Sequence, residues 1–204
     1  MAESHNHHHE HDHPSWQPIT LIRKEKIADN TMAFYFEKPT DLTFKAGQHF
    51  TMQLIDPPET DDEGITRHFS LACSPSDKEL RIATRMRDTA FKRVLESLEI
   101  GSQVNMGVPH GSYVLHEDPS KSAVFLIGGI GVTPVLSMIK DATERRLPHK
   151  LVLLLANTRP ENAPFLDELS SLAEQNKNFT FIPTMANLRS GSSWPGRTGY
   201  IDQD

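Results

Sequence analysis

The sequence predicts two structural parts: an antiparallel β-barrel of Greek-key type, followed by an incomplete α/β domain with a parallel sheet. Between residues 16 and 115, short runs rich in β-branched and aromatic residues alternate with turn signals, and one helical pattern interrupts them. From residue 123 onward, apolar strand-like runs alternate with helical patterns, as in parallel βαβ units. The 204 residues suffice for two domains of about 100 residues each. We expect a tail over 1–14, a barrel over 15–118 and an α/β domain over 119–204.

The composition excludes several classes of protein. The formal net charge is −6 and no basic stripe is present, which argues against nucleic-acid binding. No apolar run approaches the roughly 18 residues of a membrane span, and the N-terminus lacks the apolar core of a secretory signal. Cys73 is the single cysteine, which excludes disulfides within the chain and an iron–sulfur cluster that it alone ligates. We expect a cytoplasmic protein.

The N-terminal tail is rich in histidine. Six of the 11 histidines lie there: His5, His7, His8, His9, His11 and His13. Imidazoles at this density bind Zn, Ni or Cu. Because the segment has no apolar anchor, the favoured alternative is a disordered tail that binds metal without a defined site. Outside the tail, the sequence predicts no metal-ligand arrangement.

The barrel is expected to contain several short strands and one helix. The helix is predicted over 89–98, where apolar residues recur at helical spacing, and Gly101 is expected to end it. The acidic, proline-bearing segment 57–64 indicates a surface loop. Alternating and β-branched patterns predict strands over 16–26, 31–37, 48–55, 66–71, 79–86, 104–108 and 113–115.

The α/β part is expected to open with a buried strand and a glycine-rich turn. Residues 123–127 form a continuous apolar run, as in a strand that is buried on both faces. The glycines of 128–131 allow a sharp turn and a close approach to a ligand, and Thr133-Pro134 then begin a helix. Further runs predict strands over 150–156 and 179–183, with a helix over 164–174 between them. This order predicts a parallel sheet.

Residues at the end of the strand 66–71 suit a ligand that carries a phosphate and a flat ring. Arg67 offers a cationic fork, Phe69 offers a ring on the same side of the strand, and Ser70 adds a hydroxyl where the strand ends. The helix that begins near Thr89 presents unpaired N–H groups and a positive dipole end, and Lys92 adds charge. Taken alone, the same pattern also fits a core position for Phe69 and a surface ion pair for Arg67.

The motif around Arg67 resembles that of the ferredoxin–NADP reductase-like flavoprotein family, particularly its short bacterial oxidoreductases. The family pattern R-x-Y-S-x-x-S falls on Arg67, Phe69, Ser70 and Cys73. The resemblance implies bound FAD, with Arg67 on its pyrophosphate, Phe69 stacked on the flavin, and Ser70 bonded near N5 as the candidate catalytic residue. Phe69 replaces a tyrosine and loses a hydroxyl contact, and Cys73 replaces a second serine.

The glycine-rich turn carries the second part of the resemblance. It differs from the dinucleotide pattern G-x-G-x-x-G. The turn matches the family's G-G-x-G-x-T-P at Gly128, Gly129, Gly131, Thr133 and Pro134. The resemblance implies that these residues bind a nicotinamide nucleotide. The two motifs start 61 positions apart, and their order and spacing argue against an accidental match.

The resemblance adds cofactor contacts from the strand before the predicted helix and from the start of that helix. The strand segment would contact the ribityl and phosphate groups of FAD. The family's G-x-x-S at the helix start is matched poorly here, and the charge of the lysine would replace a hydroxyl contact. The residues of these two segments are Ala83, Thr84, Arg85, Thr89, Ala90, Phe91 and Lys92. Residues 107–113 resemble the family's P-x-G-x-F segment, which leads out of the barrel.

The segment after the third predicted strand of the α/β part favours NADH over NADPH. NADP-specific relatives place a serine–arginine pair there, whereas this chain has Thr184-Met185 and no cation. Arg189 and Arg197 are close enough in sequence to supply one, so NADPH remains open. Arg159 follows the second strand, where ligands gather, and either contacts the adenine nucleotide or is solvated.

The resemblance ends within the nucleotide-binding domain. In the family a strand with a C-G-P-P motif, a helix and a terminal strand follow, whereas this sequence stops at Asp204. A sheet of three parallel strands would expose a backbone edge and apolar surface. We expect the sequence to be a fragment, or a partner or second copy to cover this surface through self-association.

The resemblance implies an NAD(P)H-dependent flavoprotein reductase. NAD(P)H would give a hydride to FAD, and electrons would pass to an unknown acceptor, a protein among the candidates. The alternative is a flavin-binding electron-transfer module without turnover of its own. A third hypothesis, a metal-binding protein, rests on the tail alone.

Overall fold

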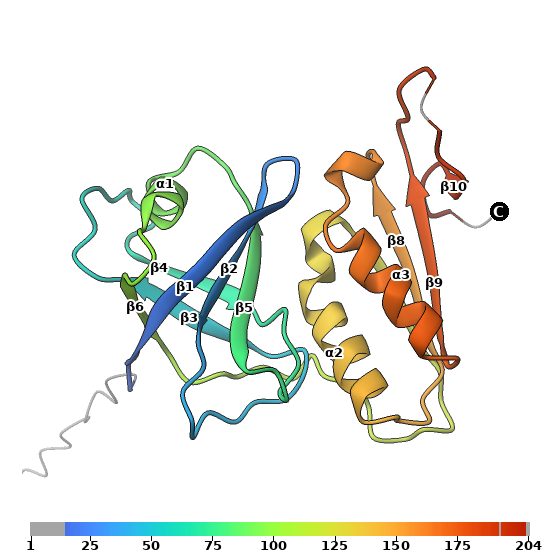
Figure 1. The fold of residues 1–204 in the computed structure, drawn as a ribbon, viewed down its shortest axis with the longest axis horizontal. Helices are drawn as coiled ribbons and strands as arrows, with labels where there is room; N and C mark the ends of the chain where they lie inside the picture. The colour runs from blue at the N-terminus through green and yellow to red at the C-terminus, as the bar shows by residue number, and fades with distance from the viewer. Residues whose placement is uncertain (1–14, 192, 203–204) are drawn as a thin grey trace, which may run out of the picture.

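The computed structural model describes residues 15–191 and 193–202 and consists of two sheets with three α-helices (Figure 1). The histidine-rich tail over 1–14 lies outside the described residues. The first sheet is antiparallel and barrel-like, and the second is parallel. The predicted order of an antiparallel barrel and a parallel α/β part is therefore confirmed.

The barrel is a six-stranded sheet that curls until its two edge strands contact one another. Its strands are β1 (Gln17–Ala28), β2 (Thr31–Glu37), β3 (His49–Leu54), β4 (Thr66–Ser70), β5 (Glu79–Arg85) and β6 (Gln103–Met106), in the order β4-β3-β6-β1-β2-β5. Just beyond β4, the N–H of Ala72 donates to the carbonyl of Arg81 in β5 (2.8 Å), which closes the barrel at that end. One helix, α1 (Ala90–Ser97), follows β5.

Alternating apolar side chains fill the barrel interior. In β3, Phe50, Met52 and Leu54 are buried and the residues between them are partly exposed, as a strand with one face on a core requires. α1 adds Phe91 and Leu95 to the same core. The packing of α1 against the barrel core therefore fixes where the N-terminus of this helix lies.

The second sheet has the order β10-β9-β8-β7. Its strands are β7 (Ala123–Gly128), β8 (Leu151–Asn157), β9 (Phe179–Met185) and β10 (Arg197–Thr198), and its helices are α2 (Thr133–Glu144) and α3 (Leu166–Gln175). Short 3₁₀ turns cover Gly129–Val132 and Pro160–Asn162. Across the described ranges, every helix is too short or too polar to span a bilayer.

β7 is an edge strand with one exposed face. Val124 and Leu126 are 59% and 62% exposed, whereas Ala123 and Phe125 are buried in the core formed with α2 and α3. The prediction of a strand buried on both faces is wrong. The reason is that α2 and α3 lie on the same side of the sheet (Figure 1).

Three further features differ from the predictions: a strand that is absent, the end of a helix, and the number of strands in the parallel sheet. The segment 113–115, expected as a strand, is irregular because no strand of the described residues pairs with it. α1 ends at Ser97, and Gly101 (φ +97°) instead forms the turn before β6, where its N–H donates to the carbonyl of Leu21 (2.8 Å). The parallel sheet has four strands rather than three, since β10 pairs with the end of β9.

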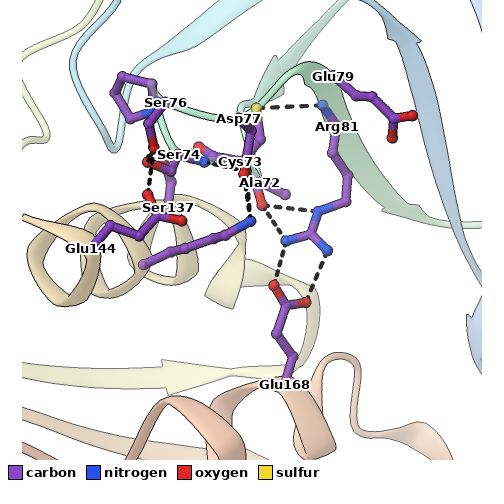
Figure 2. A network of polar contacts seen from close by, with 12 residues as sticks. Ala72, Cys73, Ser74, Ser76, Asp77, Glu79, Arg81, Ser137, Glu144 and Glu168 are labelled. Atoms are coloured by element: carbon purple, nitrogen blue, oxygen red, sulfur yellow. Dashed lines mark hydrogen bonds and ion pairs between the residues drawn. The ribbon is translucent and has the colours of Figure 1, made fainter. Parts of the chain in front are cut away.

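A polar network joins the barrel to α2 and α3 (Figure 2). Arg81 of β5 donates two hydrogen bonds of 2.8 Å to the carboxylate of Glu168 in α3. Lys140 of α2 donates to both oxygens of Asp77, in the loop before β5, at 2.7 Å. Next to these pairs, Ala83 of β5 packs into the core of the α/β part. The contacts hold the first half of β5 and the loop before it against α2 and α3.

Candidate functional site

The edge of β4 and the start of α1 form a cationic site. Arg67 lies opposite Met52 of β3 in the strand register. Its guanidinium contacts the carboxylates of Asp61 (3.1 Å) and Glu63 (2.9 Å), both from the loop between β3 and β4. The other oxygen of Asp61 accepts the N–H of Ala90, the first residue of α1 (3.2 Å). One carboxylate therefore bridges the guanidinium and the helix N-terminus.

The same arrangement offers the kind of donors that a phosphate requires. The Arg67 guanidinium is held in place because it also donates to the backbone carbonyls of Glu63, Gly64 and Thr66 (2.7–3.0 Å). The first N–H groups of α1 have no partner within the helix and favour an anion. Asp61 thus takes the place that an anionic ligand group would occupy, and the donor set fits a cofactor phosphate.

Lys92 brings a second cation to this site. Its ammonium contacts the hydroxyl of Thr84 on β5 and lies 4.8 Å from the centre of the Phe69 ring. Burial, together with the positive charges of Arg67 and Arg87, lowers the pKa of Lys92 to about 8. An anion bound here would relieve the repulsion between Lys92 and Arg67.

Phe69 and Ser70 lie on opposite faces of β4. Phe69 is buried in the barrel core against Phe91, with ring centres 5.9 Å apart. The guanidinium of Arg67 lies over the Phe91 ring, 5.0 Å from its centre. Ser70 is partly exposed, opposite His49 on the outer face. The structure therefore combines a core position for Phe69 with ion pairs at Arg67, beside a site that can accept an anion.

The remaining predicted contacts of the barrel lie on either side of this site. Thr89 is the N-cap of α1 and makes no side-chain cap hydrogen bond. Ala83 is buried toward the α/β part, while Thr84 faces Lys92. Arg85 ends β5 and reaches the glycine turn: a Cβ added to Gly129 would lie 3.3 Å from its guanidinium. β5 thus connects the cationic site to the second motif.

The glycine turn follows β7 and leads into α2. Gly129 has φ +54°, a conformation that favours glycine, and the turn from Gly129 to Val132 is a 3₁₀ helix. Thr133 and Pro134 begin α2, and the Thr133 hydroxyl donates to the carbonyl of Ile130 (3.3 Å). The predicted turn and helix start are present, and Gly128 closes the strand before them.

Asn157 marks an unfilled polar position beside this turn. It ends β8, is 6% exposed, and its side-chain amide has no hydrogen-bond partner in the part of the chain that the structure describes. Its oxygen would lie 4.0 Å from a Cβ at Gly129. Buried amides are normally hydrogen-bonded, and carboxyl strand ends are where ligands bind in such sheets. The position fits a contact to a nicotinamide nucleotide.

Asp61 was missed because its role depends on the fold. The acidic segment 57–64 is a surface loop as predicted, but it folds back onto Arg67 and α1. The one signal in the sequence was the acidic character of this loop, which lies just before the basic motif residue Arg67. Cys73, at the family's second serine, is buried with a pKa raised to about 11 by desolvation, so its thiol stays protonated.

Comparison with protein families identifies both halves. Residues 18–115 match the oxidoreductase FAD-binding domain, and residues 125–204 match the oxidoreductase NAD-binding domain. The chain belongs to the ferredoxin–NADP reductase-like family. The predicted FAD-binding and nicotinamide-nucleotide-binding domains are confirmed.

Curated relatives share about a quarter of the sequence. An NAD(P)H-flavin reductase of Aliivibrio fischeri is 28% identical over 186 residues, or 87% of this chain and 74% of the relative. Flavohemoprotein A of Dictyostelium discoideum is 28% identical over 169 residues, or 76% of this chain and 42% of the relative. Methane monooxygenase component C of Methylosinus trichosporium is 28% identical over 152 residues, or 74% of this chain and 45% of the relative. The chain therefore spans less than half the length of the last two proteins.

Solved structures of the family share the fold. A ferredoxin NADP+ reductase from Neisseria gonorrhoeae with bound FAD and NADP has a TM-score of 0.75 at 19% identity, covering 91% of this chain and 73% of the other. The cytochrome b5 reductase domain of Ulva prolifera nitrate reductase has a TM-score of 0.74 at 20% identity, and the match covers 93% of this chain and 80% of the other.

Proposed function

We propose that this chain is the FAD- and NAD(P)H-binding part of a reductase that passes electrons to a separate acceptor. The observation that carries the proposal is that two candidate nucleotide sites lie at one end of β5. Thr84 contacts Lys92 of the cationic site, and Arg85, the next residue, lies beside Gly129 of the glycine turn. A flavin and a nicotinamide must meet for hydride transfer, and this strand brings their sites together.

The residues then have distinct roles. Arg67, Lys92 and the Ala90 N–H hold the phosphates of FAD, and Asp61 leaves when they bind. The glycine turn and Asn157 hold the nicotinamide nucleotide. Bound FAD supplies the two-electron and one-electron chemistry that no side chain provides. Ser70 as hydrogen-bond donor near N5, and Phe69 as stacking partner, remain predictions. The Lys92 ammonium now lies over the Phe69 ring and would have to move for stacking.

The acceptor is proposed to be a redox centre on another protein. Support comes from relatives that are components of larger systems, such as methane monooxygenase component C and the phenol hydroxylase P5 protein of Acinetobacter pittii. The flavin reductase of Aliivibrio fischeri supports free flavin as a second candidate. NADH oxidation by the purified chain, with ferricyanide as electron acceptor, tests turnover. If the flavin-loaded chain shows no turnover, the alternative of a flavin-binding electron-transfer module without activity of its own is favoured.

The nucleotide preference is proposed to be NADH. Thr184 and Met185 are buried at the end of β9, and the Thr184 hydroxyl donates to the carbonyl of Gly199 (2.8 Å). Arg197 of β10 lies next to Thr184 in register and is exposed, so it is the cation that would favour NADPH. Comparing kcat/KM for the two nucleotides, in the native chain and in Arg197→Ala, separates these alternatives.

Self-association is proposed through β7 rather than through the end of β9. The outer edge of β7 carries no strand in the described residues, and Val124 and Leu126 are exposed beside it. We expect light scattering to give a dimer mass that the double change Val124→Ser, Leu126→Ser converts to a monomer mass. A monomer in both cases would contradict the proposal.

The central experiment is the affinity for FAD of Arg67→Ala. Loss of a charge-assisted contact to phosphate costs about 1.5–3 kcal/mol, which corresponds to roughly ten- to a hundredfold weaker binding. The matched control is Arg93→Ala, because Arg93 lies on α1 but pairs at the surface with Glu59 and Asp88. The cofactor extracted from the native chain is expected to be FAD. FMN, or equal affinities in the two variants, would refute this assignment.

A further inference from the structure

Three histidines from separate segments meet on the outer face of the barrel, away from the tail. His49 begins β3, His68 lies in β4, and His110 lies in the connection after β6. In the β3–β4 register His49 faces Ser70 and Thr51 faces His68, so all four side chains share one face. One potential ligand nitrogen from each histidine lies within 4.8 Å of the other two.

The backbone holds this cluster together. His49 and His110 exchange two backbone hydrogen bonds, of 3.1 and 2.8 Å, as an isolated antiparallel bridge. Their ring centres are 4.3 Å apart, and those of His49 and His68 are 5.8 Å apart. Gly111 has φ +114°, and a Cβ there would lie 2.9 Å from Nδ1 of His49. The absence of a side chain at Gly111 leaves room for the His49 ring.

In two of the rings, Nδ1 already has a hydrogen-bond partner. Nδ1 of His110 lies 2.9 Å from the carbonyl of Val108, which can only accept, so this nitrogen carries the proton and Nε2 has the free lone pair. Nδ1 of His68 lies 3.0 Å from the hydroxyl of Thr51, which leaves Nε2 of His68 for a ligand. Metal-binding histidines use such second hydrogen bonds to fix ring orientation.

The chemistry of the cluster favours a divalent metal. Imidazole nitrogens are ligands that suit Zn²⁺ and Cu²⁺, and three of them from separate segments converge here. Tetrahedral zinc with Zn–N distances of about 2.0–2.1 Å separates its nitrogens by about 3.3–3.4 Å. The potential ligand nitrogens now lie within 4.8 Å of one another, so zinc binding would require the exposed rings of His68 and His110 to move closer to His49.

We propose that His49, His68 and His110 form a zinc site with three protein ligands and a fourth position open to solvent. The site would tie β3, β4 and the connection after β6 together. The site lies on the same face of the sheet as Ser70, which pairs with His49 in the strand register. The fourth position can take water or one ligand from a partner. This inference rests on geometry alone and is independent of the proposed reductase activity.

The test must first remove the metal affinity of the tail. The background is the full chain with serine at the six tail positions His5, His7, His8, His9, His11 and His13. Calorimetry with Zn²⁺ in this background is expected to show one ion per chain. Co²⁺ is expected to give the intense visible bands of tetrahedral coordination. Absence of stoichiometric binding would overturn the proposal.

Substitutions then assign the ligands. His68→Asn and His110→Asn each remove an exposed ligand and are expected to weaken Zn²⁺ binding at least tenfold. His116→Asn is the control, because His116 contacts His149 and lies outside the cluster. Zn²⁺ should raise the unfolding temperature of the background and of the control but not that of the two variants. Unchanged binding in His68→Asn and His110→Asn would overturn the proposal even if a variant were less stable without metal.

The supporting hydrogen bond offers a second measurement. Thr51→Val keeps the shape of the side chain but removes the hydroxyl beside His68. Loss of such a partner typically weakens metal binding by about 10–100-fold. The Co²⁺ bands should persist, because all three ligands remain. Equal affinity with and without the hydroxyl would show that Thr51 does not position His68.

Discussion

At the scale of single residues, Lys92 has the most shifted pKa among the cations of the proposed phosphate site. Its pKa is lowered to about 8 by burial and by Arg67 and Arg87. A bound phosphate favours the charged ammonium and would return the pKa toward its usual value of about 10.4. FAD binding should therefore take up a proton between about pH 8 and pH 10, so affinity falls as pH rises, by up to about tenfold per unit. FAD titrations across this range would measure it.

Lys92→Met provides the control for this effect. The variant should bind FAD more weakly at pH 7, because a cation is lost, and should show no fall in affinity between about pH 8 and pH 10. A pH dependence that persists in Lys92→Met would mean that another group takes up the proton.

The motif residues were predictable one by one, whereas their contacts were not. Arg67 and Gly129 stand in the two motifs that carry the resemblance, and the structure places Arg67 beside the start of α1 and Gly129 in the turn before α2. Their contacts to cofactors remain predictions. Asp61 reaches Arg67 only because a loop folds back, and His49, His68 and His110 meet only across paired strands. No local pattern in the sequence records either contact.

At the scale of elements, the loop between β3 and β4 occupies the N-terminus of α1, where we propose that a phosphate of FAD binds. Asp61→Ala removes the carboxylate that bridges Arg67 and Ala90. FAD affinity should rise about tenfold, the low end for charge-assisted bonds, because Asp61 is partly exposed. Asp62→Ala is the matched control, since it removes the same charge from the next position. Fluorescence titration with FAD gives both constants, and equal values would mean that Asp61 does not compete.

Strands were predictable where their own alternation defines them. β2 has the expected bounds, because its apolar pattern requires a buried face in any fold. β10 consists of two residues and exists only through pairing with β9, which the local sequence does not encode. The exposure of β7 likewise depends on what covers the sheet, since an apolar run looks the same whether one face or both are buried.

At the scale of the whole molecule, the two domains are held in position by long-range pairs such as Arg81 with Glu168. These residues are far apart in sequence, and their side chains are only 11% and 30% exposed. The order of the domains followed from the motifs, but this contact required the structure. Its strength would matter for the proposed function, since β5 carries Arg81 and its last residue, Arg85, lies beside the glycine turn.

Glu168→Gln tests that contact. The change leaves the Arg81 guanidinium mostly buried without its ion-pair partner, so the free energy of unfolding in urea should fall by about 1.5–3 kcal/mol. The double variant Arg81→Met, Glu168→Leu should lose less, because it removes the buried charge together with its partner. Lys121→Ala breaks an exposed pair with Asp118 and should change stability by less than about 1 kcal/mol. A smaller loss in Glu168→Gln than in the double variant would mean that the pair does not hold the domains together. If Glu168→Gln loses stability as expected, slower flavin reduction by NADH in this variant, at full FAD content, would show that the same pair aligns the two proposed nucleotide sites.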